Sequence, residues 1–473
     1  MKSVARFRSK PTGWWTTHPT MLSVSVHGAF DGNGDGLGDF EGVRQKLDFF
    51  IDMGVSAYRF QHVGVYGEDY KWSGLVQQDW YNVDPHYGTM ADFDRLMKEC
   101  RGKDIKVIMM SVPEYLGWHH PDYLAAMDAR RKGIDDPRVD WFEWKDDGTV
   151  LTCWDRPGPN VANPAYMNAF LKHVGFWMDK GVAGWDCDAV GTWHHLDLET
   201  LRRLTGFVIA RHGFVTAENM VLLNDVTKFG GFNAATGYLR SEFYNELKAI
   251  CEHRADYIRD ALKVRDELIN LGMFPYQQFG DQSFKVLTNS WFCHIDEMFK
   301  LQVAFNAALP DQVWILADAL TFSDNTRPAD PKDKSRSYGT IDWNAIGRQE
   351  QDPSSVFSHV KRMFRLRAEN KELAVGHIEE VPTNHPQDVF AALRTSEDFE
   401  SSALVVFNFS ESYRDVVVIL GAGKSGNLVN YLNGERLVPV DGSICLHLYP
   451  YGFKFLKWEE RATLRGEHDP PAR

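Results

Sequence analysis

Amphipathic segments and short apolar segments alternate along most of the first 375 residues. In residues 42–60, apolar side chains recur at helical spacing at Val43, Leu47, Phe50 and Met53, and a short apolar run follows Gly54. The same order of helix, glycine and strand returns in residues 93–110, 170–188 and 201–218. A glycine at this place can adopt the left-handed conformation that ends a helix. Helices alternating with strands predict a parallel sheet covered by helices, either a closed barrel or an open doubly wound sheet.

Two parts of the chain depart from this alternation. A long stretch rich in Trp, Asp and Pro separates the strand that ends near Val112 from the strand that starts near Val182. It is too long for a plain connection, so it predicts an inserted subdomain over residues 117–181, between barrel segments 1–116 and 182–375. Short strand-like runs at 388–396, 402–410, 415–421 and 451–459 predict a separate C-terminal β-sandwich domain over residues 376–460. Residues 461–473 are expected to be a disordered tail.

Composition and charge narrow the possible functions. A chain of 473 residues is too long to fold around one compact core, so more than one domain is expected. A net charge of −13 argues against nucleic acid and anionic membranes as partners. Neither a run of about 18 apolar residues nor the apolar core of a signal peptide is present. Six scattered cysteines without a CxxC pair are typical of buried thiols in a reducing compartment, so a cytoplasmic location is expected. No glycine-rich phosphate motif follows the first strand, and no organic cofactor is implied. The oligomeric state is left open.

Several long segments resemble one known family. Residues 31–55, 79–109 and 160–190, together with 403–410 and 451–457, are similar in the same order to the α-amylase superfamily of glycoside hydrolases. The similarity is greatest to the oligo-1,6-glucosidase and sucrose-acting branches. The resemblance implies a (β/α)₈ barrel with a small inserted subdomain after the third strand and a C-terminal all-β domain. This fold agrees with the organisation that the hydrophobic pattern predicts.

The resemblance also implies three catalytic carboxylates. The segment GWDCD places Asp188 in the family's nucleophile position after the fourth strand. FVTAENM supplies Glu218 as general acid/base at the fifth strand, and QFGDQ supplies Asp281 as the third carboxylate after the seventh. A retaining glycosidase needs a nucleophilic carboxylate and a protonated carboxyl about 5 Å apart. The implied activity is hydrolysis or transglycosylation of a small α-linked saccharide or glycoside. The alternatives are an isomerising or glycosyl-transferring member of the superfamily, and a non-catalytic relative that serves as a binding or partner scaffold.

The predicted sugar pocket departs from the family. Met110, Glu114 and Tyr115 stand where the family has Asp, Asn and His, and Asp186 replaces an arginine two residues before the nucleophile. Gly280 stands in place of a histidine, and residues 74–76 lack the family's Gly-Tyr-Asp. The candidate substrate-binding residues are His62, Glu114, Tyr115, Asp186, Trp193, His194 and Gln282.

Asp186 raises an electrostatic question about the nucleophile. Residues two apart on a strand point to the same side, so Asp186 and Asp188 are expected to face the barrel mouth together. Their repulsion would raise the pKa of one carboxylate. Three arrangements offset this repulsion: a cationic substrate group, a local cation such as Arg59, or an Asp186 side chain that turns toward another donor.

A glycine-rich loop suggests a bound cation. The loop has oxygen-bearing positions at Asp31, Asn33, Asp35, Leu37 and Asp39. Alternate oxygen ligands on such a loop can enclose Ca²⁺ or Mg²⁺. The loop matches the family's cation loop, and the ion would have a structural role. The alternative is a turn that caps the helix starting near Phe40.

Overall fold

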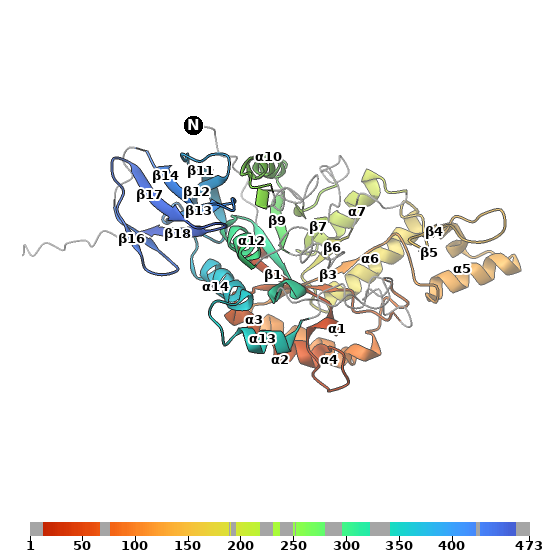
Figure 1. Ribbon diagram of the computed structural model, residues 1–473. Helices are drawn as coiled ribbons and strands as arrows, with labels where there is room; N and C mark the ends of the chain where they lie inside the picture. Colours follow the sequence, from red (N-terminus) through yellow and green to blue (C-terminus); the bar gives the residue numbers. More distant parts are fainter. Residues whose placement is uncertain are drawn as a thin grey trace, which may run out of the picture.

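The core of the computed structural model is a closed barrel of eight parallel strands (Figure 1). The structure describes residues 13–66, 76–188, 190, 195–217, 230–236, 249–250, 252–279, 296–321, 341–421 and 426–459. The barrel strands are β1 (Thr20–Val24), β2 (Ala57–Gln61), β3 (Lys106–Ser111), β6 (Gly184–Cys187), β7 (Phe214–Ala217), β8 (Ala234–Thr236), β9 (Phe274–Phe279) and β10 (Gln312–Leu316). Each strand pairs with the next in this order, and β10 pairs with β1. The closed barrel, rather than the open sheet, is therefore the correct alternative.

Helices and short 3₁₀ turns connect and surround the strands. They are η1 (Trp14–Thr16), α1 (Val26–Ala29), α2 (Phe40–Gln45), α3 (Leu47–Asp52), η3 (Pro85–Tyr87), α4 (Met90–Gly102), α6 (Pro164–Asp179), α7 (Leu198–Ile209), α10 (Asp256–Asn270), α12 (Asp296–Ala308), η7 (Ala317–Leu320), α13 (Trp343–Gln349) and α14 (Val356–Glu369). The helix expected through Val43, Leu47, Phe50 and Met53 is interrupted at Lys46, which separates α2 from α3. The Lys46 amide donates to the Val43 carbonyl, three residues back, which tightens the turn and ends α2. Val43, Leu47, Phe50 and Met53 are buried as the pattern predicts.

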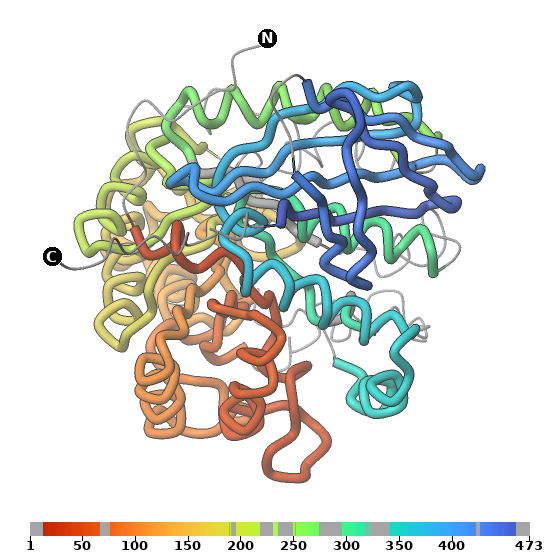
Figure 2. The backbone as a smooth tube through the Cα atoms, turned by 90° about the vertical axis from the view of Figure 1, so that its left-hand side faces the viewer, coloured from red at the N-terminus to blue at the C-terminus, as the bar shows by residue number. Residues whose placement is uncertain are grey.

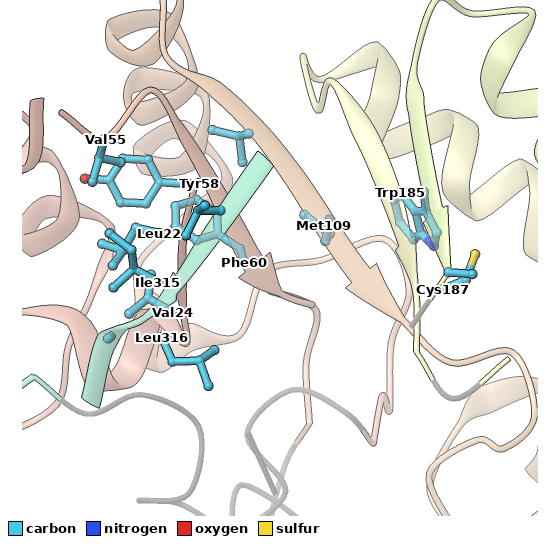
Figure 3. Packing of buried hydrophobic residues seen from close by; sticks show 14 of the residues in the cluster. Leu22, Val24, Val55, Tyr58, Phe60, Met109, Trp185, Cys187, Ile315 and Leu316 are labelled. Carbon is cyan, nitrogen blue, oxygen red and sulfur yellow. The ribbon is translucent and has the colours of Figure 1, made fainter. Parts of the chain in front are cut away.

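The alternation of side chains along each strand builds two separate cores. Outward-facing residues such as Leu22, Tyr58, Met109 and Trp185 pack between the strands and the helices (Figure 3). Inward-facing residues of the amino-terminal half form a second, apolar cluster of Met21, Ala57, Ile108, Phe214, Ala234 and Trp314. Trp14 and Trp15 pack against Phe214 and belong to the same cluster. Gln312 at the start of β10 is a buried polar residue beside this cluster, and its side-chain oxygen accepts from the Trp314 indole at 2.9 Å.

The segment between β3 and β6 extends from the barrel, at the right of Figure 1. It contains α5 (Pro121–Lys132), η4 (Pro137–Trp141) and a hairpin of β4 (Thr152–Cys153) and β5 (Arg156–Pro157). Helix α6, which also falls within residues 117–181, packs on the barrel side, where the Trp177 indole donates to the Trp80 carbonyl at 2.8 Å. The exact domain boundaries stay a prediction.

The C-terminal domain consists of antiparallel strands in two sheets. One sheet holds β11 (Gly376–Glu380), β12 (Val389–Ser396), β13 (Ser402–Asn408), β18 (Phe453–Trp458), β15 (Leu428–Asn430) and β16 (Arg436–Leu437), and the other pairs β14 (Arg414–Ile419) with β17 (Ser443–Leu448). Leu404, Val416, Leu446 and Leu456 share the cluster between the sheets. Figure 2 shows these strands lying across one side of the barrel. The all-β C-terminal domain is thereby confirmed.

The cysteines only partly follow the expectation of buried thiols. Four cysteines in the described part of the chain are free, and Cys100 and Cys187 among them are buried. Cys153 is partly buried and Cys445 is exposed, because Cys445 points outward from β17 while Ile444 and Leu446 point into the β-domain core. No helix among the described residues is long and apolar enough to cross a membrane.

Candidate active site at the carboxyl end of the barrel

Asp188 lies directly beyond the last residue of β6, the fourth strand of the barrel. Trp185 and Cys187 face outward into the core, so Gly184 and Asp186 take the inward positions, and Asp188 follows in the turn beyond the strand. Its side chain is partly buried, whereas Asp186 is fully buried. Barrel enzymes build their sites at this carboxyl-terminal face. The strand therefore places Asp188 at the carboxyl-terminal face of the barrel.

Arg59 of β2 forms a buried ion pair with Asp186. The Arg59 Nε atom lies 2.6 Å from Asp186 Oδ2, and the two side chains are 1% and 0% exposed. The same guanidinium donates to Ser23 Oγ at 3.0 Å, contacts Met110 Sδ and lies 5.7 Å from the centre of the Trp314 ring. One side chain thus crosses the barrel interior and touches strands β1, β3, β6 and β10. We call this set (Ser23, Arg59, Met110 and Asp186) the polar layer.

The polar layer shows how the negative charge of Asp186 is compensated. The prediction that Asp186 faces the barrel mouth is wrong, because Asp186 lies one layer deeper than Asp188 and is enclosed by the barrel. Of the three arrangements that could offset its charge, the local cation at Arg59 is confirmed. Because an opposite charge within hydrogen-bond distance compensates Asp186, the layer beneath Asp188 carries no net negative charge from this pair.

The other two predicted catalytic carboxylates lie outside the described residues, as do Trp193, His194, Gly280 and Gln282. The strands that precede them are described. β7, the fifth barrel strand, ends at Ala217, one residue before Glu218, and β9, the seventh, ends at Phe279, two residues before Asp281. The order of strands thus matches the order that the resemblance implies. The roles of Glu218 and Asp281 stay predictions.

His62, a candidate substrate-binding residue, is enclosed against His173 of α6. Their Nε2 atoms are 2.6 Å apart, and His62 Nδ1 accepts from the Gly64 amide at 2.8 Å. Burial lowers the pKa of His62 to about 3 and that of His173 well below its ordinary value, so both rings are neutral at pH 7. Contact between His62 and a sugar would require breaking one of these bonds. His173 was not among the predicted site residues, although it lies among the buried apolar residues of α6.

Glu114 and Tyr115 are buried beside the inserted hairpin. Tyr115 is 8% exposed and packs with Val76, Met110 and Val112. Glu114 is 1% exposed, and its Oε1 accepts from the Trp154 indole at 3.0 Å. Burial raises the pKa of the Glu114 carboxyl to about 7, against the lowering effect of the bond from Trp154. These residues form the wall behind the rim rather than an open pocket surface.

The inserted hairpin is attached to the barrel rim at two adjacent strands. Beyond β3, the Leu116 amide donates to the Pro157 carbonyl of the hairpin at 3.0 Å. Beyond β6, His195 is paired with Glu143, and the Glu143 carbonyl accepts from the Leu151 amide that leads into the hairpin. β3 and β6 are neighbours, with Met110 opposite Asp186. The hairpin therefore lies over the side of the barrel from which Asp188 emerges.

The loop predicted to bind a cation is held by its own side chains. Asp31 Oδ1 and Oδ2 accept from the amides of Gly34 and Gly36, at 2.5 and 2.7 Å. These bonds hold the pKa of Asp31 below its ordinary value. Asn33 and Asp35 each accept from the amide two residues further on. Among the described residues, no three His, Cys, Asp or Glu side chains converge as a metal site.

Asp39, at the end of this loop, caps the helix that follows. It is the N-cap of α2, which begins at Phe40, and it accepts from the amides of Gly42 and Gly32 at 2.6 and 3.2 Å. Both of its oxygens are therefore engaged in ending the loop and starting the helix. Asp31, Asn33 and Asp35 lie on the solvent side and retain further oxygen lone pairs. The side chains of these three residues, unlike that of Asp39, do not cap α2.

Comparisons with known proteins agree with this architecture. Residues 29–161 match the catalytic-domain family of α-amylases. An oligo-1,6-glucosidase from Heyndrickxia coagulans is 28% identical over 209 residues, 38% of this chain and 36% of that protein. Alpha-amylase 3 from Dictyoglomus thermophilum is 23% identical over 426 residues, 78% of this chain and 81% of that protein. The amino acid transporter heavy chain SLC3A1 of Rattus norvegicus is 25% identical over 203 residues, 37% of this chain and 29% of that protein. The chain thus aligns with little more than a third of the glucosidase.

Solved structures extend the likeness to nearly the whole chain. Amy13B of Eubacterium rectale superimposes with a TM-score of 0.75 at 20% identity, covering 93% of this chain and 95% of that chain. An α-amylase from H. orenii gives a TM-score of 0.74 at 18% identity, covering 93% and 99%. The fold and the strand order are those of these solved structures, and residues 29–161 are similar to the catalytic-domain family of α-amylases.

Proposed function

We propose that the protein is a retaining α-glycoside hydrolase or transglycosylase that acts on a small α-linked saccharide or glycoside. The observation that carries the proposal is the place of Asp188, partly buried at the carboxyl end of the fourth barrel strand, above the compensated pair of Arg59 and Asp186. The named glucosidase and amylase relatives support the same reaction class. A cytoplasmic location also stays a prediction.

In the proposed reaction, the Asp188 carboxylate attacks the anomeric carbon while the bond to the leaving oxygen breaks. Glu218 donates its proton to that oxygen, and a covalent glycosyl–Asp188 ester forms. In the second step Glu218 accepts a proton from water, in hydrolysis, or from a sugar hydroxyl, in transfer, and the incoming oxygen releases Asp188. Asp281 is proposed to hold substrate hydroxyls as positive charge develops on the ring.

The polar layer supports the ionised state that Asp188 needs. A second uncompensated carboxylate beneath the nucleophile would favour its protonated form. Arg59 removes that penalty, because its guanidinium is bonded to Asp186 within the barrel. Several positions that bind glucose in the superfamily carry other residues here, so we do not expect activity on ordinary starch. We propose a substrate that matches this non-standard pocket.

We further propose that the loop of residues 31–39 binds Ca²⁺ or Mg²⁺ in a structural role. The support is the set of oxygens from Asp31, Asn33 and Asp35 on an exposed loop whose backbone turns at Gly34 and Gly36, with φ of 88° and 92°. The loop precedes α2 and continues to its N-cap. An ion here would fix the loop and its helix and would take no part in the reaction.

The proposed activity is tested by removing the nucleophile. Asp188→Ala should lower kcat by several orders of magnitude on an aryl α-glycoside identified by screening the native protein. Azide should restore part of that turnover and yield a glycosyl azide, because the small anion takes the place of the missing carboxylate. Asp179→Ala, at an exposed acid on α6, is the matched control and should retain native turnover. Near-normal turnover of Asp188→Ala on the same substrate would refute the assignment.

The second candidate is a non-catalytic scaffold that binds a partner. One relative is named as an amino acid transporter heavy chain, and this chain lacks several residues with which the superfamily grips glucose. The same screen separates the two candidates, since a scaffold would leave every aryl α-glycoside uncleaved.

A further inference from the structure

A cavity lies on the outside of the barrel, between the neighbouring helices α6 and α7 (Figure 1). Its volume of about 840 Å³ is within the usual range of small-molecule sites, about 300–1,000 Å³. Gly175 of α6 and Phe207 of α7 meet in the lining, where a Cβ atom on Gly175 would come within 3.1 Å of the Phe207 ring. The two helices therefore pack closely at this point and fix one wall of the cavity.

The cavity is separate from the candidate active site. Arg211, in its lining, lies three residues before β7 begins, and therefore near the amino-terminal end of the barrel. Asp188 instead follows the carboxyl end of β6. A ligand bound between the two helices would not occupy the space in front of Asp188.

Cationic side chains without acidic partners lie around this cavity. Lys172 of α6 and Arg211, just beyond the end of α7, line it, are exposed, and form no ion pair with a carboxylate of the described residues. Arg203 of α7 donates to Asn168 in the lining at 2.7 Å and adds a third cation. Asp179 is the acid among the described lining residues. These groups leave an excess of positive charge at one place on a protein whose net charge is −13.

The guanidinium of Arg211 is held flat against the Phe207 ring. Its Cζ atom lies 3.6 Å from the ring centre, and its Nη1 atom donates to the Phe207 carbonyl at 3.3 Å. The other N–H groups of Arg211 are not bonded to described residues. A guanidinium that is fixed in one plane is suited to paired hydrogen bonds with phosphate oxygens, and it can also stack on an aromatic ring.

Aromatic rings supply the apolar part of the lining. Tyr81 and Phe176 contact each other edge to face, with ring centres 5.4 Å apart. Together with Phe207 they are only partly buried, so part of each ring is open to a ligand. Such rings favour contact with another flat, apolar group.

An anionic group joined to a flat apolar body matches this combination. A phosphate monoester carries a charge of about −1.5 to −2 at pH 7, which a cluster of three cations can neutralise. Its aromatic part would cover the partly buried rings and remove apolar surface from water. Asp179 repels a further anionic group on the same ligand, so a single phosphate fits better than several.

We propose that the cavity between α6 and α7 binds a phosphorylated aromatic small molecule, of the class to which nucleoside monophosphates belong. Lys172 and Arg211 bind the phosphate, with Arg203 adjacent, and Tyr81 and Phe176 contact the aromatic ring. The inference concerns a second site and does not depend on the proposed function.

The test titrates the native protein calorimetrically with adenosine monophosphate, phenyl phosphate, adenosine and inorganic phosphate. Adenosine monophosphate should bind more tightly than adenosine or inorganic phosphate, because each of these carries one part of the matching ligand. Lys172→Gln combined with Arg211→Gln should weaken its Kd at least about tenfold, through the loss of charge-assisted hydrogen bonds. Both side chains are exposed, so the fold should be retained.

A matched double variant controls for the change in net charge. Lys98→Gln combined with Arg348→Gln removes the same charge from exposed positions on α4 and α13 and should leave the Kd of adenosine monophosphate unchanged. Phenyl phosphate bound as tightly as adenosine monophosphate would extend the site to aryl phosphates in general. Failure of both phosphate esters to bind, an unchanged Kd in the Lys172→Gln/Arg211→Gln protein, or equal affinity for adenosine or inorganic phosphate would each overturn the inference.

Discussion

At the scale of single residues, Arg59 and Asp186 carry the clearest departure from the pattern of the α-amylase superfamily, which the sequence resembles. The resemblance implies an arginine two residues before the nucleophile, where this chain has Asp186. The guanidinium comes instead from Arg59, two strands away in the barrel, and reaches Asp186 across the interior. The positive and the negative charge form one buried pair, with the arginine on β2 and the aspartate on β6.

The first prediction follows from this pair. Asp186→Arg should place two buried guanidinium groups against each other and destabilise the fold by about 3–5 kcal/mol, the usual cost of breaking a buried pair. The disturbed layer lies directly beneath Asp188, so kcat/KM should fall by at least about tenfold. Asp186→Asn keeps an acceptor for Arg59 and should be harmful but less so. Thermal unfolding and kcat/KM on the same glycoside measure both effects.

The exchanged pair provides the control. Arg59→Asp combined with Asp186→Arg restores one positive and one negative charge and should recover part of the lost stability relative to Asp186→Arg alone. An Asp186→Arg protein that outperforms the parent would mean that the position is a degraded family site.

The second prediction concerns Glu114, whose pKa is raised from 4.5 to about 7 by burial. Between these values the folded protein holds the proton more tightly than the unfolded chain, so this group lowers stability as pH rises from about 4.5 to about 7. Glu114→Gln keeps the acceptor for Trp154 and has no charge to bury. The variant should match the parent near pH 4.5 and exceed it by up to about 3 kcal/mol at pH 8. Urea unfolding at pH 4.5, 6 and 8 measures the difference, and a pH-independent difference would contradict the prediction.

At the scale of elements, the loop before α2 combines turn and candidate cation site. Asp39 caps the helix, while Asp31 organises the loop through bonds from Gly34 and Gly36. The helix-capping turn corresponds to Asp39, and the candidate cation ligands correspond to other residues of the same loop.

The third prediction is that a chelator lowers the melting temperature and that added Ca²⁺ restores it, because a ligand of the folded state stabilises by mass action. Asp31→Ala should abolish the response. Asp147→Ala removes a comparable exposed turn carboxylate, which accepts from Thr149, and should leave the response intact. Melting curves that do not change with chelator or Ca²⁺ would identify the loop as a plain turn.

At the scale of the whole molecule, the buried Arg394 connects the C-terminal domain to the barrel, beside the buried Arg367 of the barrel part. Arg367 of α14 and Arg394 of β12 are both fully buried and donate to backbone carbonyls at the end of α12, including those of Ala307 and Ala308. The last carbonyls of a helix have no partner within it. Arg394, from the C-terminal domain, donates a hydrogen bond to one of these carbonyls. It thereby couples the β-domain to the barrel.

The fourth prediction is that Arg394→Met loosens this coupling. It leaves a buried helix end without its donor, which should cost about 3 kcal/mol and separate the unfolding of the β-domain from that of the barrel. Differential scanning calorimetry should then resolve two transitions. Arg365→Met, on the half-exposed face of α14 where Arg365 pairs with Glu369, should leave the parent profile nearly unchanged. A parent-like profile for Arg394→Met would show that the junction does not depend on this residue.

The sequence by itself determined the fold class and the position of Asp188. The periodicity predicts helices alternating with strands, because a strand's alternation and a helix's spacing are written in consecutive residues. The apolar face of residues 43–53 and the C-terminal strands are examples, although the break at Lys46 depends on hydrogen bonding that spacing does not reveal. The closed barrel and the place of Asp188 follow from the order of motifs that the chain shares with the family it resembles.

Only the tertiary structure decided which distant residues meet. Arg59 was one of three possibilities for Asp186 until the barrel brought β2 and β6 within reach of one side chain. The pairing of His62 with His173, and of Trp154 with Glu114, joins residues 111 and 40 positions apart. No local pattern encodes such contacts, since they depend on strand order, on the depth of each layer and on where the inserted hairpin folds back. Burial and pKa follow from those contacts, and so the chemistry around Asp188 was decided by the assembled barrel.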